Sequence, residues 1–172
     1  MARLEARIAI VTGAGQGIGR AIALGMAREG AKVVVADINA ATAKAVQAEI
    51  GAAGGTALPV QTDIADEASV QTTVATALEH FGRLDILVNN AGIFPTSSVE
   101  EMKESEWDLV IGTNLVGTFL CSKTVAPHML AQRSGRIISL TSGRAFQGAR
   151  HGAHYAASKA GVIGFCKSLA LE

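Results

Sequence analysis

The chain has 172 residues, 49% of them hydrophobic, with 15 basic and 15 acidic side chains and a formal net charge of zero. This length permits one domain with a substantial core, so we expect residues 1–172 to form a single domain. The balanced charge argues against nucleic acid as a partner, and no apolar run approaches the roughly 20 residues that a membrane span needs. The N-terminus is interrupted too soon for a signal peptide.

The two cysteines have no C-x-x-C spacing, which favours free thiols in a cytoplasmic protein. No His, Cys, Asp and Glu residues stand at metal-ligand spacing, so we expect no metal site.

Apolar runs without alternation mark the predicted strands, because a strand covered on both faces needs no polar residue at every second position. A fifth, weaker run covers residues 56–63, where Pro59 indicates a strand at the edge of the sheet. The four stronger runs are RIAIVTG (7–13), KVVVAD (32–37), LDILVNNAG (84–92) and GRIISLTS (135–142).

Helical stretches alternate with these strands. Asn39 and Asp66 are suited to cap the second and third helices, while Gly30 and Gly51 are suited to end the first and second. The expected helices are residues 17–29, 40–50, 67–80, 113–132 with a kink at Pro127, and 154–172. This alternation predicts an α/β fold: a Rossmann-like, doubly wound parallel sheet of five strands in three α/β/α layers.

A glycine-rich turn, TGAGQGIG at residues 12–19, follows the first strand and opens the first helix. Its glycines, Gly13, Gly17 and Gly19, do not follow the G-x-G-x-x-G spacing, but they allow a tight turn and a close approach of backbone N–H groups to a pyrophosphate. The helix N-terminus behind them favours negative charge. A turn that is glycine-rich for steric reasons alone is the alternative, and the position between a buried strand and a helix favours dinucleotide binding.

Asp37 ends the second strand, 18 residues after Gly19. An acidic residue at this place accepts hydrogen bonds from the ribose hydroxyls of adenosine and repels a 2′-phosphate. No lysine or arginine lies within residues 13–19 or directly after Asp37 to receive such a phosphate, so NAD is favoured over NADP. The alternative is that Asp37 only caps the next helix, for which Asn39 is already placed.

Further motifs follow in order: NNAG (89–92), Asn114, Ser142 and YAASK (155–159). Together with the glycine turn they resemble the short-chain dehydrogenases/reductases in their single-domain form, from about residue 5 to the last residue. The resemblance implies an NAD-dependent oxidoreductase that transfers hydride between nicotinamide and the carbonyl or secondary alcohol of a small substrate.

The resemblance also implies roles for single residues. Asp37 contacts the NAD ribose, Asp63 meets the adenine, Asn89 steadies the central sheet, and Lys159 also holds the nicotinamide ribose. The catalytic residues it implies are Asn114, Ser142, Tyr155 and Lys159. The cofactor-binding residues it implies are Gly13, Gln16, Gly17, Ile18, Gly19, Asp37, Asp63, Ile64, Asn90, Ala91, Gly92, Tyr155 and Lys159.

Tyr155 and Lys159 stand four residues apart in a predicted helix, which places both on one face. A phenol is a poor base at neutral pH, but a nearby ammonium favours its phenolate form. The pair could therefore exchange a proton with an alcohol or carbonyl while hydride moves. A surface pair without function is the alternative, and the glycine turn argues against it.

Ser142 lies at the end of the fifth predicted strand, where ligands of parallel sheets bind, and its hydroxyl could stabilise charge on a substrate oxygen. A serine that only makes a strand-end turn is the alternative. Ser139 and Thr141 better suit a role in the sheet or core. Asn114 is a poor helix former within a predicted helix. By resemblance it holds a water that links Lys159 to solvent; otherwise it caps a bend.

The loop before Tyr155 carries His151 and His154, and a histidine base is conceivable there. We expect these histidines instead to be solvated or to line the pocket. Three further loop residues are candidates for contact with substrate: Arg144, Gln147 and Arg150.

Members of the family run to roughly 250 residues, near the usual ceiling for a single core. By resemblance, the chain corresponds to the first two-thirds of such a protein, without the last two strands and the helical lid over the substrate. The fifth strand is then expected to have an unprotected edge. A polypeptide ending at Glu172 is expected to keep the catalytic residues but to have little turnover.

Two other functions remain open. One is a 3-ketoacyl-thioester (acyl carrier protein) reductase, which YAASKAGVIGF resembles; that branch usually prefers NADPH and carries a basic residue in the glycine turn, so Gln16 and Asp37 argue against it. The other is a non-catalytic dinucleotide-binding protein, against which the complete set of catalytic residues argues. The resemblance also implies a homodimer or homotetramer that forms through helices 113–132 and 154–172.

Overall fold

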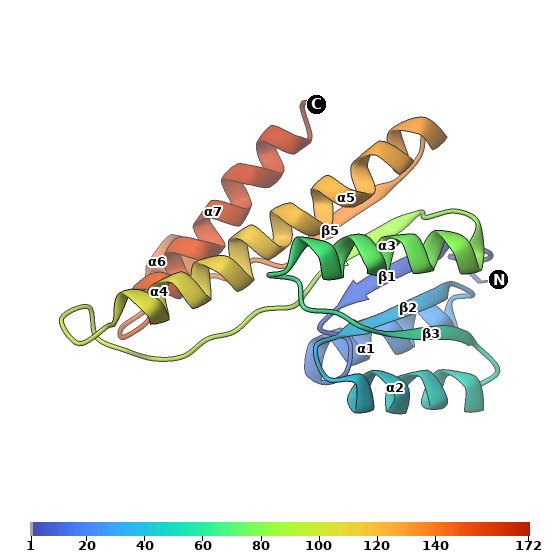
Figure 1. The fold of residues 1–172 in the computed structure, drawn as a ribbon, viewed down its shortest axis with the longest axis horizontal. Coiled ribbons are helices and arrows are strands. Elements are labelled where there is room, and N and C mark those ends of the chain that lie inside the picture. Colours follow the sequence, from blue (N-terminus) through green and yellow to red (C-terminus); the bar gives the residue numbers. More distant parts are fainter. Residues whose placement is uncertain (1) are drawn as a thin grey trace.

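The computed structural model describes residues 2–172. Its centre is a parallel sheet in the order β3-β2-β1-β4-β5. The strands are β1 (Ile8–Thr12), β2 (Lys32–Asp37), β3 (Thr56–Gln61), β4 (Ile86–Asn89) and β5 (Arg136–Ser139). The helices are α1 (Gly17–Arg28), α2 (Ala40–Ala52), α3 (Glu67–Phe81), α4 (Glu104–Ile111), the π-helical turn η1 (Gly112–Val116), α5 (Gly117–Gln132), α6 (Arg144–Gln147) and α7 (Ala153–Leu169). Figure 1 shows α1 and α2 on one face of the sheet and α3 and α5 on the other, so the predicted three-layer α/β fold is confirmed.

The central strand β1 explains why the strand runs are apolar without alternation. Ile8 and Ile10 pack into the core formed with α3 and α5, whereas Ala9 and Val11 pack into the core formed with α1 and α2. All five residues of β1 are buried. A polar residue on either face would therefore be buried without a partner, which is costly.

Several local signals in the sequence are confirmed. The side chain of Asn39 accepts N–H groups at the start of α2, and that of Asp66 accepts the Ala68 N–H at the start of α3. β3, which contains Pro59, lies at one edge of the sheet. Gly51 does not end its helix as expected, because α2 continues through it to Ala52.

The fourth and fifth strands are shorter than predicted. After Asn89 the backbone N–H groups bond to the Thr12 hydroxyl rather than to a neighbouring strand, so residues 90–92 leave the sheet. After Ser139 the Leu140 carbonyl accepts a hydrogen bond from the Lys159 ammonium. The Leu140 N–H still donates to the Asn89 carbonyl, so Leu140 is the last residue of this strand that bonds to its neighbour. Side chains therefore begin to take over the backbone hydrogen bonds where the site begins.

The predicted helix 113–132 begins earlier, since α4, η1 and α5 form one continuous helical run, Glu104–Gln132. Gly112 does not break it but has helical backbone angles. With 29 residues and a stretch of mean hydropathy 1.4, the run is long and apolar enough to cross a membrane, contrary to the expectation that no apolar run has this length. A core helix meets the same criterion, and this run packs against α3, β4 and α7.

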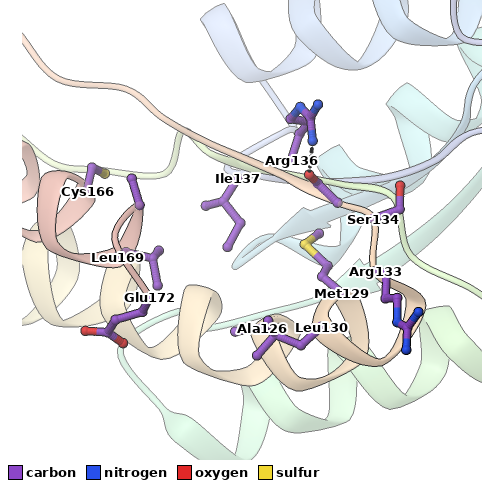
Figure 2. Close-up of a pocket in the computed structure, with 12 residues that line it drawn as sticks. Ala126, Met129, Leu130, Arg133, Ser134, Arg136, Ile137, Cys166, Leu169 and Glu172 are labelled. Atoms are coloured by element: carbon purple, nitrogen blue, oxygen red, sulfur yellow. Dashed lines mark hydrogen bonds between the residues drawn. The ribbon is translucent and has the colours of Figure 1, made fainter.

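At the other edge of the sheet, β5 pairs only with β4 among residues 2–172. A cavity of about 710 Å³ lies beside it, between the C-terminal ends of α5 and α7. Figure 2 shows Met129 and Leu130 on one side of this cavity and Leu169 on the other. None of the predicted site residues lines the cavity, which faces the amino end of β5.

Candidate active site

The glycine turn begins at the carboxyl end of β1 and leads into α1. Gly13 has a φ of +62°, and a Cβ there would lie 2.8 Å from the Cα of Ala91. A Cβ on Gly19 would collide with the carbonyl oxygen of Gly13. Both positions exclude larger residues, because the turn packs directly on the chain that leaves β4.

The N-terminus of α1 is suited to bind an anion. Its N-cap residue, Gln16, has an extended backbone, its side chain makes no capping hydrogen bond, and the first turn holds no acidic residue. First-turn N–H groups have no partner within their helix and carry partial positive charge. Gly17 and Ile18 begin this turn, and the Ile18 side chain is 67% exposed. The turn thus supplies the donors that a pyrophosphate requires.

Asp37 lies at the end of β2, beside the glycine turn. Its Oδ2 accepts the Gly15 N–H at 2.8 Å, and its Oδ1 accepts the Asn39 N–H at 3.0 Å. The N–H groups of Ala41 and Thr42, at the start of α2, donate instead to the Asn39 side chain. Asp37 therefore holds the glycine turn, and capping of α2 falls to Asn39.

Thr12 joins the glycine turn to the end of β4. Its hydroxyl oxygen accepts the N–H groups of Asn90 and Ala91, each at 3.1 Å. The side-chain amide of Asn90 donates to the carbonyls of Thr12 at 2.8 Å and Gly13 at 3.2 Å. Thr12 was not among the predicted site residues. The signal for it is its place as the one polar residue at the end of an apolar, buried strand.

Asp63 and Ile64 follow β3 at the same edge of the sheet. The Asp63 side chain is exposed, and its Oδ1 accepts the Ala65 N–H at 2.9 Å. Ile64 is 7% exposed, and its Cδ1 would lie 2.7 Å from a Cβ on Gly117. The Ile64 side chain therefore belongs to the core, whereas the Asp63 carboxylate remains open to a ligand.

Tyr155 and Lys159 lie on α7 with the ammonium close to the phenol ring. The Lys159 Nζ is 5.8 Å from the centroid of the Tyr155 ring and donates to the Leu140 carbonyl at 2.9 Å. Lys159 is only 5% exposed, and this burial lowers the pKa of its ammonium. The Leu140 carbonyl fixes the amine at the carboxyl end of β5.

Asn114 lies fully buried in η1. Its Oδ1 accepts the Ile93 N–H at 2.8 Å, while its Nδ2 donates to the Ile93 carbonyl at 3.0 Å and to the Ser158 hydroxyl at 3.1 Å. A Cβ on Gly92 would lie 3.1 Å from Asn114 Oδ1 and 3.5 Å from Lys159 Nζ. The π-helical turn thus brings Asn114, Gly92 and Lys159 together, and such turns are frequent at functional sites.

Ser142 is half-buried just after β5, where its hydroxyl oxygen accepts the Arg144 N–H at 3.2 Å. This contact lies at the start of α6, a short helix that was not predicted. The Ser139 hydroxyl accepts a hydrogen bond from Asn89 at 3.1 Å, and the Thr141 hydroxyl donates to the Lys159 carbonyl at 2.9 Å. Ser139 and Thr141 therefore support the sheet and α7, as expected for them.

Phe94 packs against the Tyr155 ring, with the ring centroids 4.4 Å apart. The Arg144 guanidinium lies 5.1 Å from the Phe94 centroid. Phe94 was not among the predicted site residues. Its signal is a rare aromatic residue just after NNAG, in a chain with only five phenylalanines. Phe94 thus contacts both the Tyr155 ring and Arg144, a predicted substrate contact.

The expectation that His154 is solvated or lines a pocket is wrong. Its side chain is 0% exposed, because α4 packs over the start of α7. His151, in contrast, is exposed, with a φ of +54°.

The sequence of the chain matches a family of known proteins. A family model described as short chain dehydrogenase matches residues 7–172. The chain belongs to the short-chain dehydrogenase family. It is 49% identical to a 3-oxoacyl-[acyl-carrier-protein] reductase of Synechocystis over 100% of its length and 70% of the relative's. It is 47% identical to the reductase FabG of Staphylococcus aureus (95% and 67%), and 40% identical to (2S)-[(R)-hydroxy(phenyl)methyl]succinyl-CoA dehydrogenase subunit BbsD of Thauera aromatica (98% and 68%).

As a short-chain dehydrogenase, the protein is an oxidoreductase that acts on CH–OH groups with a nicotinamide cofactor. Its own residues fit such a group. The glycine turn at Gly13 and Gly19 leaves no room for a Cβ, the N-terminus of α1 has no capping side chain from Gln16, and the Asp37 carboxylate lies beside both.

Proposed function

We propose that this short-chain dehydrogenase uses Tyr155 as the general acid or base in hydride transfer between NAD and the carbonyl or secondary alcohol of a small substrate. The observation that carries the proposal is the buried Lys159 ammonium beside the Tyr155 ring, at the same edge of the sheet as the glycine turn. Bound NAD would supply the hydride acceptor, and its reduced form the donor. The turn at 12–19, together with Asp37, Asp63 and residues 90–92, would hold it.

The proposed chemistry of the protein's own groups is proton transfer. In the reducing direction the Tyr155 hydroxyl gives its proton to the carbonyl oxygen, and the Lys159 ammonium stabilises the phenolate that remains. The Ser142 oxygen already accepts the Arg144 N–H, so the serine proton is free to bond to the substrate oxygen. Asn114 bonds to the backbone of Ile93, which lies between Gly92 and Phe94, and so holds this stretch of chain in place.

Tyr155→Phe tests this assignment and separates an enzyme from a dinucleotide-binding protein without activity. Loss of the phenol should lower kcat by about 10²–10⁴-fold, the usual contribution of general acid–base catalysis. Binding of NADH, measured by its fluorescence, should change less than about threefold. The reason is that the phenol hydroxyl is proposed to act mainly in the transition state, and such an interaction affects kcat rather than binding. Turnover that persists in the variant would contradict the role of Tyr155, and wild-type protein that binds NADH without turnover of any substrate would support the binding-protein alternative.

The preference for NAD over NADP is also proposed. Asp37 carries a negative charge at the glycine turn, Gln16 is neutral, and no lysine or arginine pairs with Asp37 among the described residues. A 2′-phosphate close to this carboxylate would be repelled. The ratio of kcat/KM with NADH to that with NADPH, measured on one substrate, tests the preference; a ratio below one would overturn it.

A 3-oxoacyl thioester is the second candidate substrate, and the printed names of the Synechocystis and Staphylococcus relatives favour it. Reduction of such a thioester should be compared with that of a simple ketone of equal chain length. Much higher kcat/KM for the thioester would favour this candidate. Equal values would favour a broader alcohol or ketone substrate.

We propose that the protein forms a homodimer or homotetramer through helices 113–132 and 154–172. Apolar side chains on these helices are exposed, with Phe119 43% and Leu130 68% accessible, and the Phe119 ring lies 6.0 Å from that of Phe165 on the second helix. Sedimentation velocity of the wild type and of Phe119→Lys tests this, since a buried lysine should dissociate the assembly. A wild-type monomer would overturn it.

We further propose that residues 1–172 form one domain and that the protein is cytoplasmic, acting on a small molecule rather than on nucleic acid or membranes. A single cooperative thermal transition tests the first statement. Recovery in the soluble fraction after cell lysis tests the second.

A further inference from the structure

His154 precedes Tyr155 on α7 and is fully buried, which is unusual for a histidine. Its Nδ1 accepts the backbone N–H of Tyr155 at 2.9 Å. Its Nε2 is buried and has no hydrogen-bond partner among the described residues. A carboxylate oxygen, Oε1 of Glu106 on α4, lies 3.7 Å from this Nε2 atom. A buried polar atom in this position requires an explanation, because such atoms are rare and costly.

The start of α7 explains the contact with Tyr155. Tyr155 is the third residue of the helix, so its N–H has no partner within the helix. The N-cap residue is Gly152, which has no side chain to accept that N–H. The imidazole takes the place of the missing cap from inside the helix.

The tautomer of His154 follows from the same contact. Because Nδ1 accepts a hydrogen bond, it carries no proton, and the neutral ring is protonated at Nε2. That N–H faces the Glu106 carboxylate, which lies in the first turn of α4, where negative charge is favoured. Figure 1 shows α4 alongside the first part of α7, so the ring lies where the two helices pack together.

We propose that His154 is a positioning residue for the phenol. It binds the Tyr155 backbone through Nδ1 and faces Glu106 through Nε2–H, and so holds the first turn of α7 at one distance from α4. The Tyr155 ring then keeps its place against Phe94 and near the Lys159 ammonium. His154 touches neither substrate nor cofactor in this role. The proposal rests on the assignment of Tyr155 as the proton-transfer group.

Three substitutions separate the two nitrogens. In His154→Asn the amide oxygen can stand where Nδ1 accepts the Tyr155 N–H. In His154→Gln the amide can reach the place of Nε2 but leaves the Tyr155 N–H unpaired. His154→Leu removes both contacts and keeps an apolar side chain in the core. His80→Asn, at an exposed histidine on α3, is the matched control.

We expect kcat to fall about 10- to 100-fold in the Gln and Leu variants, since a misplacement of about 1 Å can cost 10²-fold. KM and the NADH dissociation constant should change less than about twofold, and the Asn variant should keep most of the wild-type kcat. Glu106→Gln should have a smaller effect, about two- to fivefold, because its contact is longer than a hydrogen bond. The proposal would be overturned if all His154 variants kept the wild-type kcat, or if the Asn and Leu variants lost kcat to the same extent.

A second readout needs neither cofactor nor turnover. Because the chain has one tyrosine, protein labelled with ¹⁵N-tyrosine gives a single amide signal, that of Tyr155. Its hydrogen exchange should be about 10-fold or more faster in the Gln and Leu variants than in the wild type, and nearly unchanged in Asn. Tyr155→Phe is assayed in parallel: if it keeps its activity, the proposed function fails, whereas if it is inactive and the His154 variants are not, only the role of His154 fails.

Discussion

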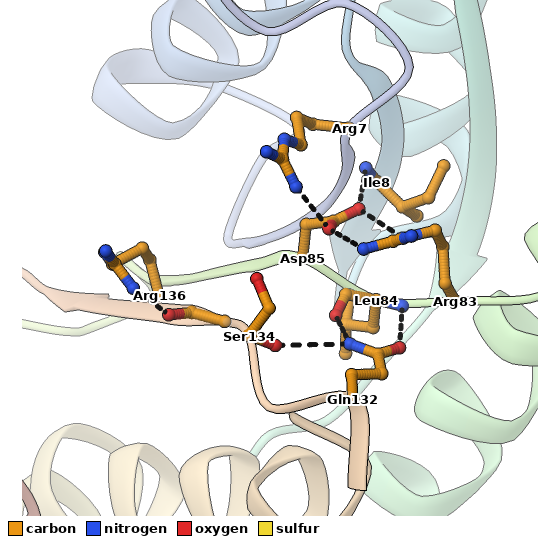
Figure 3. Close-up of polar contacts among 9 residues, drawn as sticks. Arg7, Ile8, Arg83, Leu84, Asp85, Gln132, Ser134 and Arg136 are labelled. Carbon is orange, nitrogen blue, oxygen red and sulfur yellow. Dashed lines mark hydrogen bonds and ion pairs between the residues drawn. The ribbon is translucent and has the colours of Figure 1, made fainter. Parts of the chain in front are cut away.

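At the amino end of the sheet, the buried carboxylate of Asp85 lies between two arginines, whereas at the carboxyl end the equally buried Asp37 meets only backbone N–H groups. Figure 3 shows the first arrangement: Arg7 donates to Asp85 at 3.0 Å, Arg83 donates at 2.6 and 3.1 Å, and the Ile8 N–H donates at 3.0 Å. The cations come from the residues just before β1 and β4, so the carboxylate ties the starts of two paired strands together.

Asp37 differs in its partners rather than in its burial. The two side chains are 3% and 8% exposed, yet Asp37 receives only the N–H groups of Gly15 and Asn39. Its negative charge is therefore not cancelled, and its oxygens can accept further hydrogen bonds. A buried carboxylate with fixed cations serves the fold, and one without them remains available to a ligand.

Asp37→Asn gives the largest effect expected from this comparison. The amide oxygen keeps an acceptor for the Gly15 N–H, while the hydrogen bond from the Asn39 N–H is given up and the charge is removed. Repulsion of a 2′-phosphate, worth several kcal/mol, is therefore lost. We expect the ratio of kcat/KM for NADH over NADPH to fall about 10- to 1,000-fold, mostly through tighter binding of NADPH. Steady-state kinetics with both nucleotides measure this ratio.

Asp85→Asn serves as the control for that experiment, because it removes a charge of equal sign at the opposite end of the sheet. Its nucleotide ratio should equal that of the wild type. A similar shift in both variants would show that overall charge, and not the position of Asp37, sets the preference.

Asp85→Ala should affect stability instead. It leaves the buried Ile8 N–H without a partner and places two arginines together without their carboxylate, a loss of about 1–3 kcal/mol in the free energy of unfolding. Urea denaturation measures the loss, and Asp108→Ala, at an exposed aspartate on α4, should change it by less than about 0.5 kcal/mol. Unchanged stability in Asp85→Ala would show that the arginine cluster contributes nothing to the fold.

The features that could be predicted from the sequence depend on neighbours along the chain. Asn39 and Asp66 accept hydrogen bonds from backbone N–H groups no more than three residues further along the chain. Pro59 indicates an edge strand because it has no N–H to donate to a neighbouring strand. The Tyr155–Lys159 spacing places both groups on one helix face through local geometry alone.

The features that could not be predicted depend on packing between distant segments. His154 is buried because α4 covers it, about fifty residues earlier in the chain, and nothing near His154 in the sequence indicates this. The predicted helix began at residue 113, but the helical run of the structure passes through Gly112 into the π-helical turn that carries Asn114. Phe94 is a neighbour of Tyr155 because the chain that follows β4 passes close to α7, a contact between segments about sixty residues apart.

Acid titration gives the smallest effect. Burial raises the pKa of Asp85, but hydrogen bonds from Arg83, Ile8 and Arg7 lower it further, so it lies below its ordinary value. The unfolded chain therefore binds the proton first as the pH falls. The contribution of Asp85 is complete above the unfolded pKa of about 3.9 and is lost as the pH falls through the folded value. Because both arginines are about half exposed, we expect only about 0.2–1 kcal/mol.

The measurement is the free energy of unfolding from neutral pH to about pH 2, compared between the wild type and Asp85→Asn, which has no carboxylate to titrate at this position. The wild type should lose more stability on acidification, and the difference should shrink at high salt because the half-exposed arginines are screened. Parallel curves for the two proteins would mean that the pKa of Asp85 is the same in the folded and unfolded chain, so that its cations give the ionised carboxylate no net stabilisation. Asp85 and Asp37 would then differ only in their position in the sheet, and not in how strongly their charges are stabilised.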